Sequence, residues 1–287
     1  MPEGYCHHTM KLFVMTDLEG VAGVMNSKDW IYSTSEYYEH AKRLLTEEVN
    51  AAVRGFLAGG FDEVIAYDGH GTGGMDAELL HPEAKIMRGY DRGPDGWKIY
   101  PFGIDKSYDA LAFVGQHAKA GTPNSHLTHT MSWNFLDTTV NGVSIGEYGM
   151  MVLSCGELGI PVIFASGEKA LCEEAAALCP WVITAAVKEG TIPGLGNDLD
   201  AQQWENYHQG VISLAPPKAR QIIQQQAKLA ADQFTRNRSA FKPLVLEKPY
   251  TIITKYRDSK DGNGPARTVT ASHAQSVSEC MNAMFRL

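Results

Sequence analysis

The sequence predicts an α/β protein with a mainly parallel sheet flanked by helices. Short, almost wholly apolar runs end in polar loops, and helical stretches with an apolar stripe alternate with these runs along the chain. Such alternation is typical of parallel strands whose connecting helices cover the faces of the sheet. The sequence shows no internal repeat and no low-complexity tract.

The first half of the chain contains the clearest elements. A strand is expected at 11–15 (KLFVM), followed by a long amphipathic helix at 35–58 with Ser35 as its cap and Gly59-Gly60 as its stop. The remaining elements of this part are strands at 63–67 and 110–115, a helix at 146–158, a strand at 162–165, a helix at 168–178 and a strand at 182–186.

Around 190–210 the pattern dissolves into Gly, Pro, Asn and Asp, which predicts a linker or a loop that faces substrate. Beyond it we expect a helix from Pro217 to about Arg236, strands at 250–256 and 267–271, and a last helix ending near Phe285. Because 287 residues exceed one typical domain, we predict two. A larger α/β domain, 10–200, carries the candidate catalytic and metal-binding residues, and a smaller α+β domain spans 201–287.

Composition narrows the class of partner. The net charge is −8 and Lys and Arg are not clustered, so we expect no nucleic acid partner. No segment reaches the roughly 20 apolar residues that span a bilayer, and the N-terminal stretch has no secretory pattern. The five cysteines form no CxxC pair, which predicts reduced, buried thiols and a cytoplasmic location.

Residues of metal-binding type follow the predicted strands. Asp17 and Glu19 follow the first strand, His70 the second and His117 the third, while Glu147 opens a helix after an Asn-Gly turn. In an open parallel sheet, ligands bind beyond the carboxyl ends of the strands, so we expect these side chains to meet. Carboxylates and imidazoles together suit zinc or a similar divalent ion.

This set is large enough for two ions. A single catalytic zinc usually takes three ligands from protein, and the sequence offers five. Two zinc ions about 3.5–4 Å apart that share a carboxylate account for the excess, and Asp17 is the candidate for the shared position. Taken singly, an Asp after a strand is usually a turn residue and a His usually bonds within the fold, so the joint placement carries the prediction.

Three further residues have two interpretations each. His129 is placed to donate a proton or to stabilise an oxyanion, because histidine titrates near neutral pH. His126, in the same NSHLTHTMSW loop, is equally well explained as a structural residue. Asp68 either orients a ligand histidine or caps the turn at Gly69.

Seven stretches of the sequence, in their order along the chain, resemble the zinc-dependent D-aminopeptidases of the DppA type. They cover most of residues 10–190 and are MTDLEGVAGV, VIAYDGHG, FVGQHAKAGTP, SHLTHTM, NGVSIGEYG, PVIFASGEKA and VITAAVKEG. The resemblance implies that the five candidate ligands hold a dinuclear zinc centre and that His129 is a further active-site residue. The loop before His129 is one residue longer than the family pattern, so the choice between His129 and His126 stays open.

The resemblance also implies an activity and an assembly. The expected enzyme is an aminopeptidase that cleaves short peptides, notably those with an N-terminal D-residue, by attack of a metal-activated water on the amide. The expected assembly is a homo-oligomer, a ring-stacked decamer. The physiological peptide is left open.

Two other functions compete with this one. Another metal-dependent hydrolase, an amidase or a phosphatase, would use the same ion types, although a dehalogenase-like phosphatase needs Asp where Glu19 stands and gives no reason for His70 and His117. A metal-stabilised module that only binds peptides would have a closed ligand set without a position for water. Turnover of a peptide with zinc present separates these possibilities.

Overall fold

The main sheet fixes the positions of all the candidate ligands. In the computed structural model, which describes residues 8–89, 91–93, 96–260 and 264–286, seven strands are ordered β11-β10-β9-β6-β1-β2-β3. All neighbours are parallel except β10 and β11. The α/β prediction is therefore confirmed. The strands are β1 (Lys11–Thr16), β2 (Glu63–Asp68), β3 (Ala84–Met87), β6 (Ala110–Gln116), β9 (Val162–Glu168), β10 (Ile183–Gly190) and β11 (Val211–Ser213).

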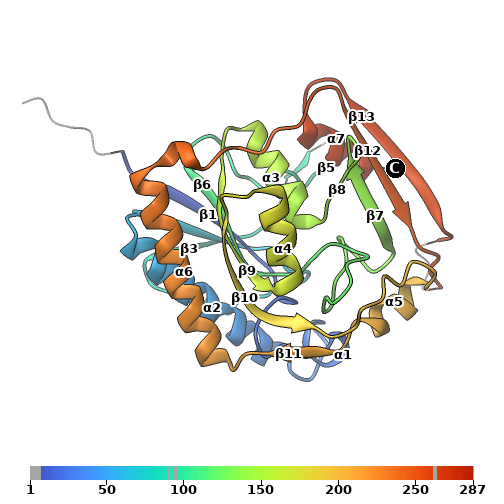
Figure 1. Ribbon diagram of the computed structural model, residues 1–287, viewed down its shortest axis with the longest axis horizontal. Helices are drawn as coiled ribbons and strands as arrows, with labels where there is room; N and C mark the ends of the chain where they lie inside the picture. The colour runs from blue at the N-terminus through green and yellow to red at the C-terminus, as the bar shows by residue number, and fades with distance from the viewer. Residues whose placement is uncertain (1–7, 90, 94–95, 261–263, 287) are drawn as a thin grey trace, which may run out of the picture.

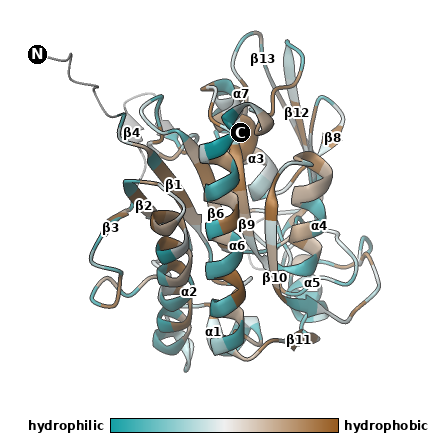
Figure 2. Cartoon of the chain, turned by 60° about the vertical axis from the view of Figure 1, so that its left-hand side comes forward, coloured by the Kyte–Doolittle hydropathy of each residue, from teal (hydrophilic) through white to brown (hydrophobic). Residues whose placement is uncertain are grey.

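Helices cover both faces of this sheet (Figure 1). On one face lie α2 (Tyr38–Ala58) and α6 (Pro216–Arg236), side by side as Figure 2 shows, with their apolar sides toward the strands. On the other lie α3 (Glu147–Glu157) and α4 (Lys169–Leu178), while α7 (Val277–Met284) packs against α3 and the smaller sheet described next. Because side chains alternate along a strand, Leu12 and Val14 of β1 join the first core and Phe13 and Met15 the second.

A second, antiparallel sheet has the order β13-β12-β7-β8. Asn141 and Gly142 connect β7 to β8 with φ of 49° and 82°, as a two-residue hairpin loop requires. Both sheets combine segments from either side of residue 200, since β11 joins the main sheet and β7 pairs with β12. The proposed division into two domains stays a prediction. The strands are β7 (Phe135–Val140), β8 (Val143–Ser144), β12 (Tyr250–Tyr256) and β13 (Arg267–His273).

Short elements fill the connections. A small hairpin and three short helices lie between the longer elements, namely β4 (Asp91–Gly93), β5 (Gly96–Lys98), α1 (Ser27–Trp30), α5 (Ala201–Tyr207) and η1 (Arg238–Ala240). The region predicted as linker therefore contains a helix. Asp200 and Gln203 form a capping box at its start, a signal that stands in the sequence but lies within a Gly- and Pro-rich stretch.

The predicted start of the long helix was wrong. α2 begins at Tyr38, and Ser35 is not its cap. The hydroxyl of Ser35 instead donates to the carbonyl oxygen of Lys28, 2.6 Å away, and so closes the preceding turn after α1. A serine side chain competes for local backbone partners in this way wherever a turn is available.

The described cysteines agree with the expected reduced state. Four are free and buried, and Cys6 lies outside the described residues. None of the helices in the described residues is both long enough and apolar enough to cross a bilayer.

The contact between α2 and α6 depends on small residues. A Cβ on Gly55 would lie 2.5 Å from the carbonyl oxygen of Gln224 and 2.8 Å from the Cβ of Ala227. The two helices approach closely because this position has no side chain. Gly55 also lies in the buried face of α2.

Replacing Gly55 with Val should separate these helices. We expect Gly55→Val to lower the free energy of unfolding by about 1–3 kcal/mol, because overpacking forces the backbone to shift. Urea denaturation measures this change. Ala58→Val, on the exposed face of the same helix, is the control and should cost less than about 1 kcal/mol. Equal losses in the two variants would contradict the packing argument.

Candidate metal centre

The candidate ligands meet at one edge of the main sheet. β1 lies between β2 and β6. The chain therefore continues from β1 to β2 on one side of it and only later adds β6 on its other side. Ligand sites in α/β sheets form at such a reversal of strand order. Asp17 follows β1 here, and His70 and His117 follow its two neighbours. The structure brings all five predicted ligands together, in two overlapping groups.

The first group consists of Asp17, Glu19 and His70. The Nδ1 atom of His70 lies 3.0 Å from Oδ1 of Asp17 and 3.2 Å from Oε2 of Glu19. Its Nε2 atom lies 2.8 Å from the carbonyl oxygen of Ile31. A carbonyl only accepts, so the hydrogen is on Nε2 and the lone pair of Nδ1 faces the carboxylates.

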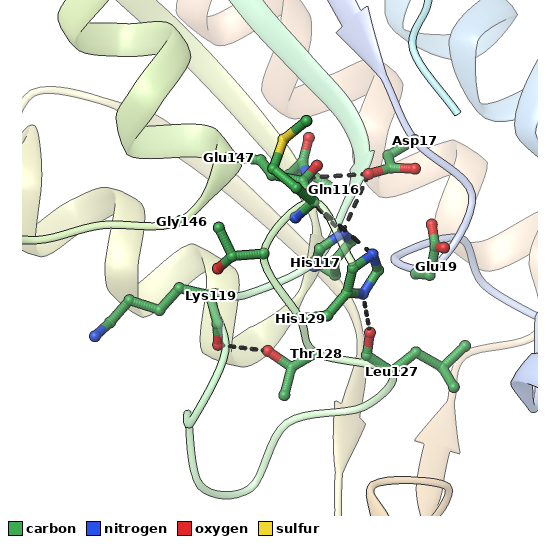
Figure 3. A network of polar contacts seen from close by, with 12 residues as sticks. Asp17, Glu19, Gln116, His117, Lys119, Leu127, Thr128, His129, Gly146 and Glu147 are labelled. Carbon is green, nitrogen blue, oxygen red and sulfur yellow. Dashed lines mark hydrogen bonds and ion pairs between the residues drawn. The ribbon is translucent and has the colours of Figure 1, made fainter. Parts of the chain in front are cut away.

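The second group repeats this arrangement around His117. Its Nδ1 atom donates to the carbonyl oxygen of Ala118, 2.9 Å away, which leaves a lone pair on Nε2. That Nε2 lies 3.2 Å from Oδ2 of Asp17 and 3.6 Å from Oε1 of Glu147, and it is buried with no hydrogen-bond partner among the described residues. Asp17 thus faces one group with each of its oxygens, and Figure 3 shows its contacts with His117 and Gln116.

A positive charge is needed in both groups. Burial alone would lower the pKa of His70 and of His117, but Glu19 acts on the first and Glu147 on the second, and both pKa values are raised well above the usual range. Burial would likewise raise the pKa of Asp17, yet the two neighbouring histidines, His117 and His70, hold it well below its usual value. Imidazole nitrogens and carboxylates that face one another therefore fit divalent metal ions such as zinc.

Two glycines allow the strand ends to come this close. Gly115, with φ of 75°, would place a Cβ 2.1 Å from the carbonyl oxygen of Asp17. Gly20 would place one 2.0 Å from the carbonyl oxygen of Gln116, and its N–H donates to Gly115. Any side chain at either position would push the loop after β1 away from the end of β6 and separate the ligands that they carry.

The structure distinguishes the two histidines of the following loop. His129 lines the cavity described below, and its ring stacks on that of His117 with centroids 4.1 Å apart. His129 also falls within the second group, with Nε2 3.9 Å from Oε1 of Glu147. His126 is fully buried, its Nε2 atom lies 3.1 Å from the carbonyl oxygen of Met25, and burial lowers its pKa to about 2. A histidine that stays neutral and has no access to the cavity fits a structural role.

Asp68 shapes the loop that carries His70. Its Oδ1 accepts from the backbone N–H of Gly74, and its Oδ2 lies 3.4 Å from a guanidinium nitrogen of Arg88. No hydrogen bond joins Asp68 to His70 in the described structure. The interpretation as a turn-stabilising residue therefore fits, whereas the carbonyl of Ile31 orients His70.

Gln116 was not predicted, although it stands next to His117. Its amide donates to Oδ2 of Asp17 over 3.1 Å. This bond positions the carboxylate shared by the two groups. Gln116 is the last residue of β6, and a position at a strand end is the signal that led to the candidate ligands. It was not selected because an amide is not among the usual zinc ligands.

A cavity of about 640 Å³ opens directly over the two groups. Asp17, Glu19, His70, His129 and Glu147 line it. A small ligand that enters therefore meets the carboxylates and imidazoles at once. Pockets of this size, with a few convergent polar groups, are typical of small-molecule sites.

Comparison with known proteins gives one consistent answer. Residues 10–278 match the model of the D-aminopeptidase family. The chain is 29% identical over 241 residues to a D-aminopeptidase of Bacillus subtilis (strain 168), a match that covers 82% of this chain and 77% of that protein. It also shares its fold, at a TM-score of 0.76, 24% identity and 97% coverage of both chains, with a structure described as the zinc-dependent D-aminopeptidase DppA from Bacillus subtilis, a self-compartmentalizing protease.

A buried ionic cluster behind the site was also missed by the sequence prediction. Lys188 donates to the carbonyl oxygens of Val21 and Val24, and Glu48 accepts from the N–H of Ala22. Burial lowers the pKa of Lys188 and raises that of Glu48. The cluster thereby fixes the loop that follows Asp17.

Glu168 is the third member of this cluster. At the end of β9, it accepts from the N–H of Ala118 over 2.7 Å and from that of His126 over 2.5 Å. Burial raises its pKa, while the charges of His117 and Lys188 act in the opposite direction. Glu168 holds the loop after β6 as Lys188 and Glu48 hold the loop after β1.

Removing the buried ammonium should destabilise the fold. We expect Lys188→Met to lower the free energy of unfolding by about 3–5 kcal/mol, because two carboxylates lose their cation and two carbonyls their donor. Lys169→Met is the control. Lys169 is exposed and pairs with Glu189 at the surface, so its loss should cost at most about 1 kcal/mol. Denaturant titration of both variants provides the comparison, and an equal cost would refute the assigned role.

Proposed function

The chain belongs to the D-aminopeptidase family, and on this basis we propose that it is a dinuclear zinc aminopeptidase that removes the first residue, notably a D-residue, from short peptides. Family membership confirms the prediction of an aminopeptidase. The choice of zinc is supported by the similar structure, which is described as zinc-dependent, and by the donor set. The preference for short peptides and for a D-residue rests on the family resemblance.

The observation that carries the proposal is the pair of histidine lone pairs facing carboxylate oxygens. Asp17, Glu19 and His70 would hold one ion, and Asp17, His117 and Glu147 the other. Each histidine is oriented by a backbone carbonyl on its far nitrogen, the arrangement typical of metal ligands. Zinc ions bound there would polarise the peptide carbonyl and lower the pKa of a water molecule.

His129 is assigned the proton transfer. Its Nδ1 atom donates to the carbonyl oxygen of Leu127, 2.9 Å away, so a lone pair remains on Nε2 beside the cavity. Burial lowers the pKa of His129, and the neighbouring charge of His117 lowers it further. A neutral imidazole is ready to accept the proton of the attacking water at Nε2 and then to pass it to the departing amine.

The remaining parts of the proposal concern assembly and location. We infer a homo-oligomer, a ring-stacked decamer, since the similar structure is described as self-compartmentalizing. A cytoplasmic location is supported by the four free, buried cysteines. Light scattering on the purified protein measures the mass of the assembly.

Family membership and site geometry disfavour the competing functions. A phosphatase would not match a peptidase family over 10–278. A closed, purely structural metal site would not line a cavity of about 640 Å³ with its ligands. Of the functions considered, hydrolysis of a peptide bond therefore fits best.

Metal removal should abolish the activity reversibly. We expect the protein to lose its hydrolysis of D- and L-dipeptides with a chelator and to regain it on addition of zinc. Release of the N-terminal amino acid, followed by chromatography, is the measurement. A panel that also contains amides and phosphate esters tests the other hydrolase classes. If zinc-replete protein left every peptide intact, the proposed function would be wrong.

Variants separate the ligands from the proton-transfer residue. We expect His117→Ala and Glu147→Ala to lower both the bound zinc and the rate. His129→Ala should lower the rate by about 10²–10⁴-fold at preserved zinc content. Elemental analysis beside steady-state kinetics measures both quantities.

His40→Ala provides the control for these variants, because His40 is exposed and does not line the cavity. It should change neither quantity. A loss of zinc in His129→Ala as large as that in His117→Ala would instead identify His129 as a ligand. Unchanged zinc in Glu147→Ala would remove that residue from the ligand set.

A further inference from the structure

The cavity over the ligands has two chemically different ends. One wall is apolar and is formed by side chains of the second hydrophobic core, among them Met15, Ile99, Tyr100, Phe102 and Met151. Met15, Tyr100 and Met151 are buried, whereas Ile99 and Phe102 are partly accessible. We call this apolar wall the pouch, and the burial of Met15, Tyr100 and Met151 places it on the inner side of the cavity.

Another part of the lining forms a rim that is polar and open to solvent. Tyr32, Ser33, Thr34, Gly71 and Thr72 line it, and all five are exposed. The hydroxyl of Tyr32 donates to Glu205 of α5, which places that helix beside the opening. An extended polar chain can leave the cavity here without loss of hydration.

The apolar pouch begins at the ligands themselves. Met15 precedes Asp17 by two residues at the end of β1, and Met151 follows Glu147 by four residues on α3. Residues four apart on a helix lie on the same face. The N–H of Met131, whose side chain also lines the cavity, donates to Oε1 of Glu147 over 2.6 Å. The apolar lining is therefore directly connected to the candidate ligands by Met15, Met131 and Met151.

These observations assign an occupant to the pouch. Building on the proposed function, we infer that the pouch is the subsite for the side chain of the first residue of the substrate, and that it selects large apolar side chains. An aminopeptidase has a single residue before the bond it cleaves, so this residue must lie at the inner side of the cavity. The rest of the peptide leaves along the polar rim.

The composition of the wall sets the breadth of this selection. Thioether side chains adapt to different shapes, so Met15, Met131 and Met151 should accept Leu, Met and Phe side chains alike. Among the described residues that line the cavity there is no Lys or Arg, while Asp17, Glu19 and Glu147 contribute carboxylates. Acidic side chains should therefore be rejected. A Lys side chain should also be rejected, because the apolar end offers its ammonium no partner.

The test is a series of Xaa-Gly dipeptides in both stereochemical forms, with Xaa as Ala, Leu, Met, Phe, Asp and Lys. We expect kcat/KM for Leu, Met and Phe to exceed that for Ala by about 10-fold or more, since each buried methylene is worth about that much in an apolar pocket. Asp and Lys should fall below Ala. The reversed peptides, Gly-Xaa, should show little dependence on Xaa.

Variants locate the selection in the pouch. Ile99→Ala and Phe102→Ala should each reduce the Leu-to-Ala ratio of kcat/KM by about 10-fold. Leu246→Ala is the matched control. Leu246 is also partly buried against the same core but does not line the cavity, so the ratio should stay constant. Zinc content and thermal unfolding verify that each variant is folded, and Ile99→Val with Phe102→Leu replaces any that is not.

Several outcomes would overturn the inference while leaving the proposed function intact. They are a best rate with Ala, a best rate with a charged residue, selection that follows the second residue, or equal effects of Ile99→Ala and Leu246→Ala. Failure to cleave every peptide with zinc bound would overturn the proposed function and this inference together.

Discussion

The arrangement of the site depends on one electrostatic constraint. His70 and His117 each direct a lone pair at a carboxylate, at 3.0 Å and 3.2 Å from Asp17. Two acceptors at that distance repel one another unless a positive charge lies between them. A proton on the imidazole or a bound metal ion supplies this charge, and the rest of the structure holds the groups in place around it.

The scaffold supplies this restraint through backbone contacts and through a few buried side chains. Carbonyls of Ile31 and Ala118 fix the two rings, and the close approach at Gly20 and Gly115 fixes the loops. The buried Lys188 and Glu168 then tie those loops to the sheet. Precise placement of catalytic ligands generally requires such a supporting layer on rigid elements.

Strand position and residue type together were enough to predict which side chains meet at the candidate metal centre. The meeting of Asp17, His70 and His117 could be predicted because they follow three apolar runs and because their side-chain types commonly bind metals. Glu168 also ends a strand and is also a carboxylate. It was missed because its side chain accepts from two backbone N–H groups instead, and the direction of a side chain at a strand end depends on the neighbouring loops.

Other structural features could not be predicted because local sequence signals compete or because strands pair with partners far away in the sequence. Ser35 is a good helix cap by type, but the turn after α1 uses its hydroxyl. The capping box of α5 lies in a segment whose composition indicates a loop. β7 acquires its main partner, β12, more than a hundred residues later in the chain, and no periodicity within either segment specifies that pairing.

The division of the ligands along the chain has a consequence for biosynthesis. Asp17, Glu19 and His70 all lie within the first 70 residues, whereas His117 and Glu147 come later. Chains emerge from the ribosome N-terminus first, so β1, α2 and β2 are available before β6 has been translated. Three of the five candidate ligands would therefore emerge before the other two. Capture of a first cation at that stage would template the docking of β6, and metal supply would then influence the yield of folded enzyme as well as its turnover.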